Sequence, residues 1–244
     1  RNSVKIAVDA YNGSVTFYVA DPTDPLIQTY QAIFPDLFRP LDAMPSSLRA
    51  HLRYPEDLFR IQAVMLLTYH MQNPAVFYNR EDVWSVPHER FGDNRQPLEP
   101  YYMLMRLPDS AREEFVLMLP LAPADRENMI AWLVARNDPP HYGSLLVYKY
   151  PKDKLIYGPF QIETRIDQDP TIAAQLTLWN QSGTRVIRGN LLVIPVGSAN
   201  LYVEPIYLQA AQSPLPELKR VVVATGNRLA MEPTLEAALA RLFS

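Results

Sequence analysis

The spacing of apolar and polar positions along the chain changes from strand-like to helix-like and back. The first segment, VKIAVDAYNGSVTFYVAD, alternates apolar and polar residues around Asn12-Gly13, the dipeptide that two-residue type I′ turns favour. Such a turn predicts a hairpin in which Val8 pairs with Phe17, and it places Lys5 on the opposite face. The apolar face of this hairpin is then predicted to carry Ile6, Val8, Ala10, Val15, Phe17 and Val19.

A helical spacing takes over near residue 24, and we expect a helical insertion over about residues 24–98. A first helix begins at Asp24-Pro25 and ends at Pro35, and a longer one runs from Pro55 to about Met71. The polar tract from Asn79 to Pro100 is predicted to be an irregular loop. On the first helix, one apolar side is predicted to carry Leu26, Tyr30, Ile33 and Phe34. The core-facing stripe of the longer helix is predicted to consist of Leu58, Ile61, Met65, Leu66 and Tyr69.

Strand-like segments return in the second half of the chain. YYMLMRL, EEFVLML and SLLVYKY predict strands, whereas the helical spacing of apolar residues between Pro123 and Arg136 predicts a helix there. Asp169-Pro170 predicts another helix start, because the carboxylate accepts a free first-turn N–H and proline has no N–H to lose. Hairpins are predicted around residues 197–200, where Ile194 would face Val203, and around Gly226-Asn227, and an amphipathic helix ends the chain from Thr234 to Phe243.

These elements predict an α+β fold, mainly antiparallel sheet with packed helices and a helical insertion. We expect one domain over residues 1–244, and two subdomains divided near residue 99 are the alternative. The strands on either side of residues 197–200 are apolar on both faces, which indicates that both faces are covered. Glu204 interrupts the second of these strands beside Pro205. A buried carboxylate would need a partner, so we interpret Glu204 as an edge position.

Composition limits the classes of protein that fit. The chain has 244 residues, 48% of them hydrophobic, and a nearly balanced charge of 23 Lys+Arg against 26 Asp+Glu, which argues against a general nucleic-acid or anionic-membrane binder. No apolar run approaches the roughly 18 residues of a membrane-spanning helix. The chain contains no cysteine, which excludes disulfides and thiolate chemistry. Because it begins at Arg1 without a methionine, we expect a fragment or a processed product.

The sequence carries few signs of catalysis. No pair of its four histidines has metal-ligand spacing, and G-x-S-x-G, G-x-G-x-x-G and P-loop motifs are absent. Among polar clusters expected in loops, HLRYPED contains His51, and NDPPHYG contains Asp138 and His141. A histidine beside an acid is the arrangement that a general base requires, although a capped helix start and a helix stop explain these clusters equally simply. Asp167 and Asp169 in TRIDQDP are the candidate ligands for a hard cation such as Ca²⁺, but Asp169 already caps a helix.

Several longer strings together point to one protein family. They include VDAYNGSVTFYVAD, LRAHLRYPEDLFRIQ, TYHMQNPAVFYNREDVW, MIAWLVARNDPPHYG, QLTLWNQSGTRVIRGNLLVIP and MEPTLEAALARLF. Over nearly the whole chain they resemble the uncharacterised protein family UPF0182, bacterial multi-pass membrane proteins with a large soluble C-terminal region. The resemblance implies that the chain is the C-terminal part of that region, and it carries no catalytic residues over.

We therefore expect a non-enzymatic, extracytoplasmic soluble domain of an integral membrane protein in the cell membrane, acting in binding or assembly. Its expected partners are the family's N-terminal transmembrane region, a second copy, or an envelope protein or lipid, and neither a cofactor nor a nucleic acid is expected. The alternatives are an envelope hydrolase or transferase that uses His51 or His141 with a nearby acid, and a domain that binds lipid in an apolar cavity.

Overall fold

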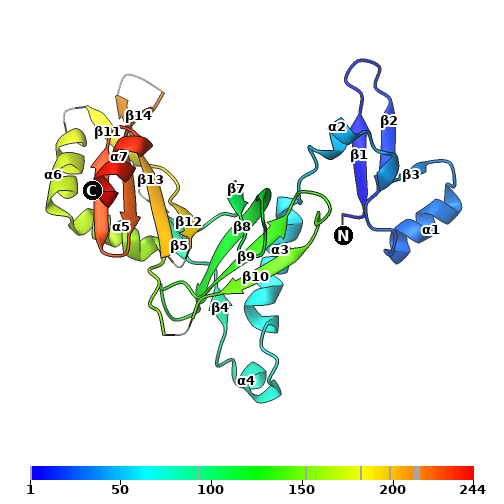
Figure 1. Ribbon diagram of the computed structural model, residues 1–244, viewed down its shortest axis with the longest axis horizontal. Helices are drawn as coiled ribbons and strands as arrows, with labels where there is room; N and C mark the ends of the chain where they lie inside the picture. Colours follow the sequence, from blue (N-terminus) through cyan, green and yellow to red (C-terminus); the bar gives the residue numbers. More distant parts are fainter. Residues whose placement is uncertain (1, 93, 152, 182, 198, 211–214) are drawn as a thin grey trace. The chain divides into compact units, whose positions relative to one another are not determined.

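The computed structural model describes residues 2–92, 94–151, 153–181, 183–197, 199–210 and 215–244 (Figure 1). Helices alternate with mostly antiparallel strands, so the predicted α+β class is confirmed. The chain divides into two compact units, each built from segments distant in the sequence. Unit 1 contains residues 1–65, 102–117 and 135–145, and unit 2 contains residues 66–101, 118–134 and 146–244.

Unit 1 begins with a three-stranded sheet of β1 (Val4–Val8), β2 (Val15–Val19) and β3 (Phe38–Pro40), in the order β1-β2-β3. The hairpin was predicted correctly, but its register is two residues from the prediction because Val8 pairs with Val15. The turn is longer than two residues, since the backbone N–H of Asp9 donates to the carbonyl of Ser14. A shift of two keeps each side chain on its predicted face.

Helices follow this hairpin as the sequence predicts, and strands follow them. The helices are α1 (Pro25–Ile33), a 3-10 turn η1 (Leu41–Ala43), α2 (Ser46–Arg49), α3 (Glu56–Tyr69) and α4 (Pro74–Asn79). The side chain of Asp24 caps α1 by accepting from the N–H of Leu26. The tract from Asn79 to Pro100 is not an irregular loop, because it forms β4 (Trp84–Ser85) and a hairpin of β5 (His88–Phe91) and β6 (Asn94–Pro97).

The next sheet has the strand order β10-β9-β8-β4, with β7 also paired to β8. Its remaining strands are β7 (Tyr101–Arg106), β8 (Glu113–Pro123), β9 (Ala131–Arg136) and β10 (Leu145–Lys149). Strand β9 corrects the predicted helix from Pro123 to Arg136. Its five residues 131–135 are all buried, and an apolar run of this kind fits a fully covered strand as well as a helix.

The third sheet belongs to unit 2 and has the order β11-β13-β14-β15, with β12 paired to β13. Its strands are β11 (Thr184–Arg188), β12 (Leu192–Val196), β13 (Ala199–Ala210), β14 (Glu217–Thr225) and β15 (Arg228–Glu232). The predicted turn at Gly226-Asn227 is confirmed, because Thr225 pairs with Arg228. The register of β12 and β13 again differs by two, since Ile194 pairs with Leu201.

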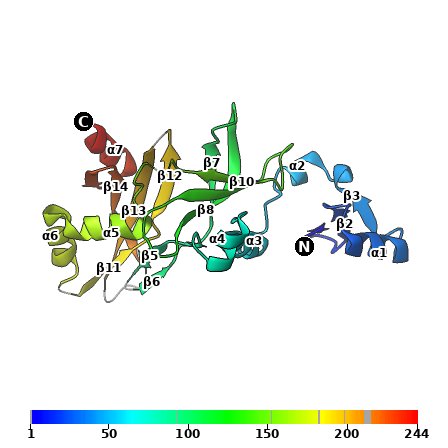
Figure 2. The same cartoon turned by 90° about the horizontal axis from the view of Figure 1, so that it is seen from below.

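Helices cover this third sheet. Helix α7 (Leu235–Phe243) buries Ala238 and Leu242 against Val203, Val221, Val223 and Ala230. Two further helices, α5 (Pro159–Gln168) and α6 (Pro170–Trp179), are joined at Asp169, which caps α6 as predicted by accepting from the N–H groups of Thr171 and Ile172. Helix α5 packs against β5, and β5 lies beside β11 (Figure 2).

Candidate functional site

Three carboxyl groups are buried together in unit 2. Glu89 of β5, Glu163 of α5 and Glu204 of β13 each have 0% of their surface exposed. Arg188, the last residue of β11, is buried with them. Charged groups cost several kcal/mol to bury unless they are paired or change their protonation state. The cluster therefore needs an account of each group's partners.

Arg188 and Glu204 form a two-bonded ion pair. The Nε of Arg188 donates to Oε1 of Glu204 at 2.5 Å, and its Nη2 donates to Oε2 at 2.7 Å. Strand β13 pairs with β14 on one side and with β11 and β12 on the other, so Glu204 is not at an edge and that interpretation was wrong. Residue 204 lies opposite the connection between β11 and β12, where the ladder between β13 and these two strands is interrupted.

Glu163 and Glu89 have weaker partners than Glu204. Both oxygens of Glu163 accept from the single backbone N–H of Arg90, at 2.8 and 2.7 Å. Burial, followed by repulsion from Glu204, raises the pKa of Glu163 to about 8. Glu89 accepts from the backbone N–H of Leu191 at 3.1 Å and from two side-chain amides, yet burial still raises its pKa. These carboxyl groups therefore favour the neutral form more than exposed ones do.

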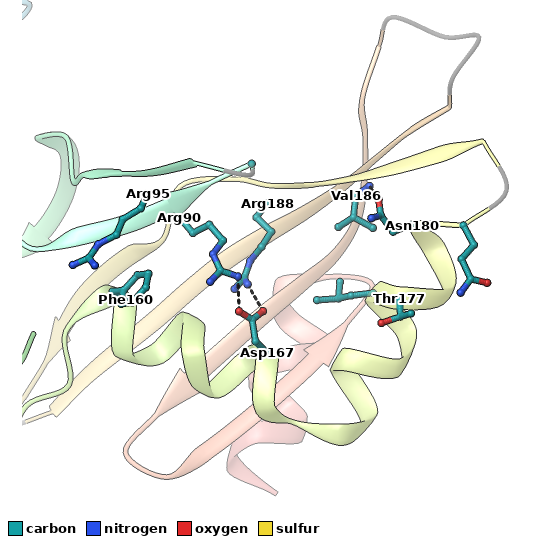
Figure 3. A pocket seen from close by; sticks show the side chains of 11 residues that line it. Arg90, Arg95, Phe160, Asp167, Thr177, Asn180, Val186 and Arg188 are labelled. Atoms are coloured by element: carbon teal, nitrogen blue, oxygen red, sulfur yellow. Dashed lines mark hydrogen bonds and ion pairs between the residues drawn. The ribbon is translucent and has the colours of Figure 1, made fainter.

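The cluster continues into an open groove through Asp167. This carboxylate accepts from Nη1 of Arg90 at 2.5 Å and from Nη1 of Arg188 at 2.5 Å, and Figure 3 shows both guanidinium groups converging on it. The groove has a volume of about 630 Å³. Its lining includes Arg90, Gly92, Arg95, Phe160, Asp167, Leu176, Thr177, Asn180, Gln181, Val186 and Arg188.

The arginines of the groove differ in how fully their donors are used. Arg188 has three of its five N–H groups engaged by Glu204 and Asp167. Arg95 donates to Glu127 at 2.5 Å and lies over the ring of Phe160, 4.5 Å from its centre. For Arg90, the bond to Asp167 is the one side-chain hydrogen bond found within the described part of the chain. Its other donors remain available to a ligand.

The lining favours binding over covalent chemistry. Its one hydroxyl, on Thr177, donates to the carbonyl of Ala173 within α6. No histidine lies among the described residues of the lining, so a nucleophile beside a base is not assembled there. Guanidinium, amide and hydroxyl groups around an open groove suit a polar molecule with an acidic group.

The predicted catalytic candidates belong to unit 1, whereas the carboxyl cluster belongs to unit 2. His51 follows α2 and is exposed, and His141 lies in the turn between β9 and β10 and is exposed. The carboxylate of Asp138 accepts from the backbone N–H of Phe115 at 2.8 Å, which holds the chain at the end of β9. The described contacts give Asp138 a structural partner and show no hydrogen bond between it and the His51 or His141 side chain.

The predicted metal candidates also have other partners. TRIDQDP is not a loop, because Asp167 lies in the last turn of α5 and binds two arginines, while Asp169 caps α6. No group of three or more His, Cys, Asp or Glu side chains that would hold a metal ion occurs among the described residues.

Sequence reasoning missed Arg90, Glu163 and Arg188. One signal was present: Glu204 stands in an otherwise apolar strand, and a carboxylate buried there requires a cation. The nearest upstream arginine on a paired strand is Arg188, which supplies it. The positions of Arg90 and Glu163 depend on how β5 packs against α5, which local spacing does not predict.

Comparisons with known proteins identify relatives along the whole chain. The family model described as "Uncharacterised protein family (UPF0182)" matches residues 1–179. A UPF0182 protein of Moorella thermoacetica is 60% identical over 243 residues, which cover 100% of this chain and 27% of the relative. A UPF0182 protein of Cupriavidus necator is 58% identical over 248 residues, with 100% and 27% covered. No solved structure matches the chain significantly.

The chain thus spans about a quarter of the length of these relatives. Among the described residues, no helix combines the length and apolar character that crossing a bilayer requires. The family model matches most of the chain, and the relatives align with the whole of it. Both findings agree with the resemblance that the sequence strings indicate. The chain therefore belongs to the uncharacterised protein family UPF0182.

Proposed function

We propose that this chain is a non-enzymatic, extracytoplasmic binding domain of an integral membrane protein, and that unit 2 binds a small molecule bearing a carboxylate or phosphate group. The observation that carries the binding proposal is Arg90, which turns a largely unused guanidinium group toward the groove. The membrane context rests on the family resemblance described above.

The charge balance explains why the ligand is recognised by directed bonds. Of the guanidinium groups in the lining, that of Arg188 is neutralised by Glu204 and that of Arg95 is paired with Glu127. Asp167 is shared between Arg90 and Arg188. The groove is therefore close to neutral, and its affinity for an acid comes from N–H donors already held in place.

The groove also favours a polar ligand over a lipid. An apolar ligand requires a continuous apolar wall, whereas this lining alternates charged and amide groups with a few apolar side chains. The acidic group of the ligand would lie against Arg90 and Arg95. Its polar remainder would lie toward Thr177 on α6 and Asn180 just after it (Figure 3).

Titration calorimetry with inorganic phosphate and with succinate, at constant ionic strength, tests the proposal. Saturable binding of at least one probe is expected, and Arg90→Gln should weaken it at least tenfold because a charged hydrogen bond contributes about 1.5–3 kcal/mol. Lys219→Gln is the matched control, since it removes one positive charge from an exposed position of β14 outside the groove. Equal loss in both variants, or no binding to the parent chain, would refute the proposed site.

The membrane context is tested separately from ligand binding. Fusing reporters that are active on one side of the membrane to the end of a full-length relative should place residues equivalent to 1–244 outside the cytoplasm. A reporter active in the cytoplasm at that position would contradict the proposed location and leave the binding experiment unaffected.

A further inference from the structure

The hairpin of β1 and β2 exposes the part of its apolar face that lies near the turn. Ile6 and Val8 are 59% and 64% exposed, although both lie on the face that also carries Val15. Lys5, on the opposite face, is half-buried and lies 5.6 Å from the ring centre of Tyr142. Burial lowers the pKa of the Lys5 ammonium group. The lysine is thus covered by unit 1 while Ile6, Val8 and Val15 face solvent, which is the reverse of the usual pattern, and Val19 at the far end of the same face is buried.

Helix α1 shows the same reversal. Its apolar residues at helical spacing form a stripe that is between 49% and 69% exposed, and Ile27 is its one buried residue. The stripe consists of Leu26, Tyr30, Ile33 and Phe34. The helix has no acidic residue in its first turn and no basic residue in its last, and its sequence PLIQTYQAIF contains no charge.

Uncharged apolar stripes of this length are unusual on a free surface. Soluble monomers rarely expose large contiguous apolar patches, and permanent interfaces resemble a domain core cut in two. The absence of Lys and Arg from α1 also argues against a membrane surface, because interfacial helices normally carry basic residues on their polar face. The occupant that fits is an apolar protein segment that is always present.

We propose that the α1 stripe and the exposed apolar face of the β1–β2 hairpin dock against another segment of the same polypeptide in a longer family protein. The relatives contain further chain beyond the matched part, because this chain matches only 27% of their length. A covalently attached segment is permanently available, as the apolar character of the stripe requires. This inference goes beyond the groove in unit 2 and does not depend on ligand binding there.

Hydrogen exchange tests the docking directly. The isolated chain is compared with a full-length relative in which residues 1–244 replace the matching segment. The amides of α1 and of the β1–β2 hairpin should exchange at least tenfold more slowly in the full-length protein. The strands β13 and β14, which are buried within unit 2, serve as the internal control and should exchange equally in both.

A pair of charge substitutions on α1 sharpens the test. Ile33→Glu places a carboxylate in the stripe, whereas Ala32→Glu places one at an exposed position on the opposite side of the same helix. Both variants should leave the melting temperature of the isolated chain within about 3 °C of the parent, because both positions are exposed there. In the full-length protein, Ile33→Glu should remove the extra exchange protection and Ala32→Glu should retain it.

Other occupants give distinguishable results. Unchanged exchange of α1 on going from the isolated chain to the full-length protein would overturn the proposal. So would dimerisation of the isolated chain that Ile33→Glu abolishes, because the occupant would then be a second copy. Binding of the isolated chain to vesicles of neutral phospholipid through α1 would also overturn the proposal, because the occupant would then be a lipid surface.

Discussion

Replacing Glu163 with glutamine should make the free energy of unfolding less dependent on pH between about 5 and 8. Burial raises the pKa of this carboxyl group from 4.5 to about 8 in the folded chain, whereas in the unfolded chain it is exposed to water. Over this interval the folded state therefore holds a proton that the unfolded state has released. Stability contributed by such a group is present at low pH and is lost as the pH rises toward 8.

The magnitude follows from the proton balance. A difference of one bound proton changes the free energy of unfolding by at most about 1.4 kcal/mol per pH unit. The structure gives the cause, because among the described residues Glu163 accepts only from one backbone N–H, that of Arg90, while burial and repulsion from Glu204 disfavour its charge. A glutamine at position 163 has a carbonyl oxygen for the same N–H and no proton to lose.

Urea unfolding at pH 5, 6, 7 and 8 measures the effect as the difference between the parent and Glu163→Gln. The parent should lose stability relative to the variant as the pH rises, so that the variant is the more stable protein at pH 8. Glu217→Gln, at an exposed position of β14, controls for the loss of one carboxylate. Parallel curves for the parent and Glu163→Gln would show that Glu163 is ionised throughout, and would refute the reasoning.

Three further substitutions test individual contacts. Arg188→Met should lower the free energy of unfolding in urea by about 3–5 kcal/mol at pH 7, because it leaves Glu204 buried without its partner, and Arg188→Met/Glu204→Met should recover much of the loss. Gly158→Ala should lower the melting temperature by several degrees, since a Cβ would lie 1.8 Å from the backbone oxygen of Glu127 and the backbone must move. Asp169→Ala should cost about 1 kcal/mol in urea unfolding by removing the cap of α6, and Ca²⁺ should stabilise parent and variant equally little.

Two of the predicted hairpins, β1–β2 and β12–β13, show what local pattern determines. In each, the strands and their faces are confirmed, and the register differs by two residues. Apolar alternation fixes which side chains share a face, and a shift of two leaves that unchanged. The turn decides the register, and Asp9 extends the first turn by accepting from the N–H of Tyr11. The dipeptide Asn12-Gly13 predicted a turn correctly without defining its length.

The predicted helix before Arg136 failed for a different reason. Every residue from 131 to 135 is buried in β9, so no solvent-facing position marks a strand period. Helix α5 was missed, and TRIDQDP, which includes its last residues, was counted among the polar clusters expected in loops. In the structure these charges are satisfied by partners distant in the sequence, among them Arg90 and Arg188 for Asp167. Partners of that kind depend on tertiary packing, which local spacing does not encode.

The candidate groove was partly accessible to sequence reasoning. The requirement that a buried carboxylate have a partner is general, and applied to Glu204 it would have directed attention to an arginine on a neighbouring strand. Because Glu204 was interpreted as an edge position, no partner was predicted for it. In the structure β13 is paired on both sides, so Glu204 is not at an edge and does need a partner.

Helix α3 extends the reversal seen on α1 and shows where apolar periodicity stops being informative. Ile61 and Met65 were predicted to be in the core, yet they are 63% and 53% exposed, while Phe59 and Ala63 on another side of the helix are buried. Apolar periodicity identifies which residues of a helix are covered, but it does not show which surface covers them. Helix α3 buries one side within unit 1 and exposes a second apolar side. This composition is typical of a helix that is covered on both sides. The docking proposal accounts for the second covering on α1, and the same exchange experiment extends to α3, whose amides near Ile61 should also exchange more slowly in the full-length protein than in the isolated chain.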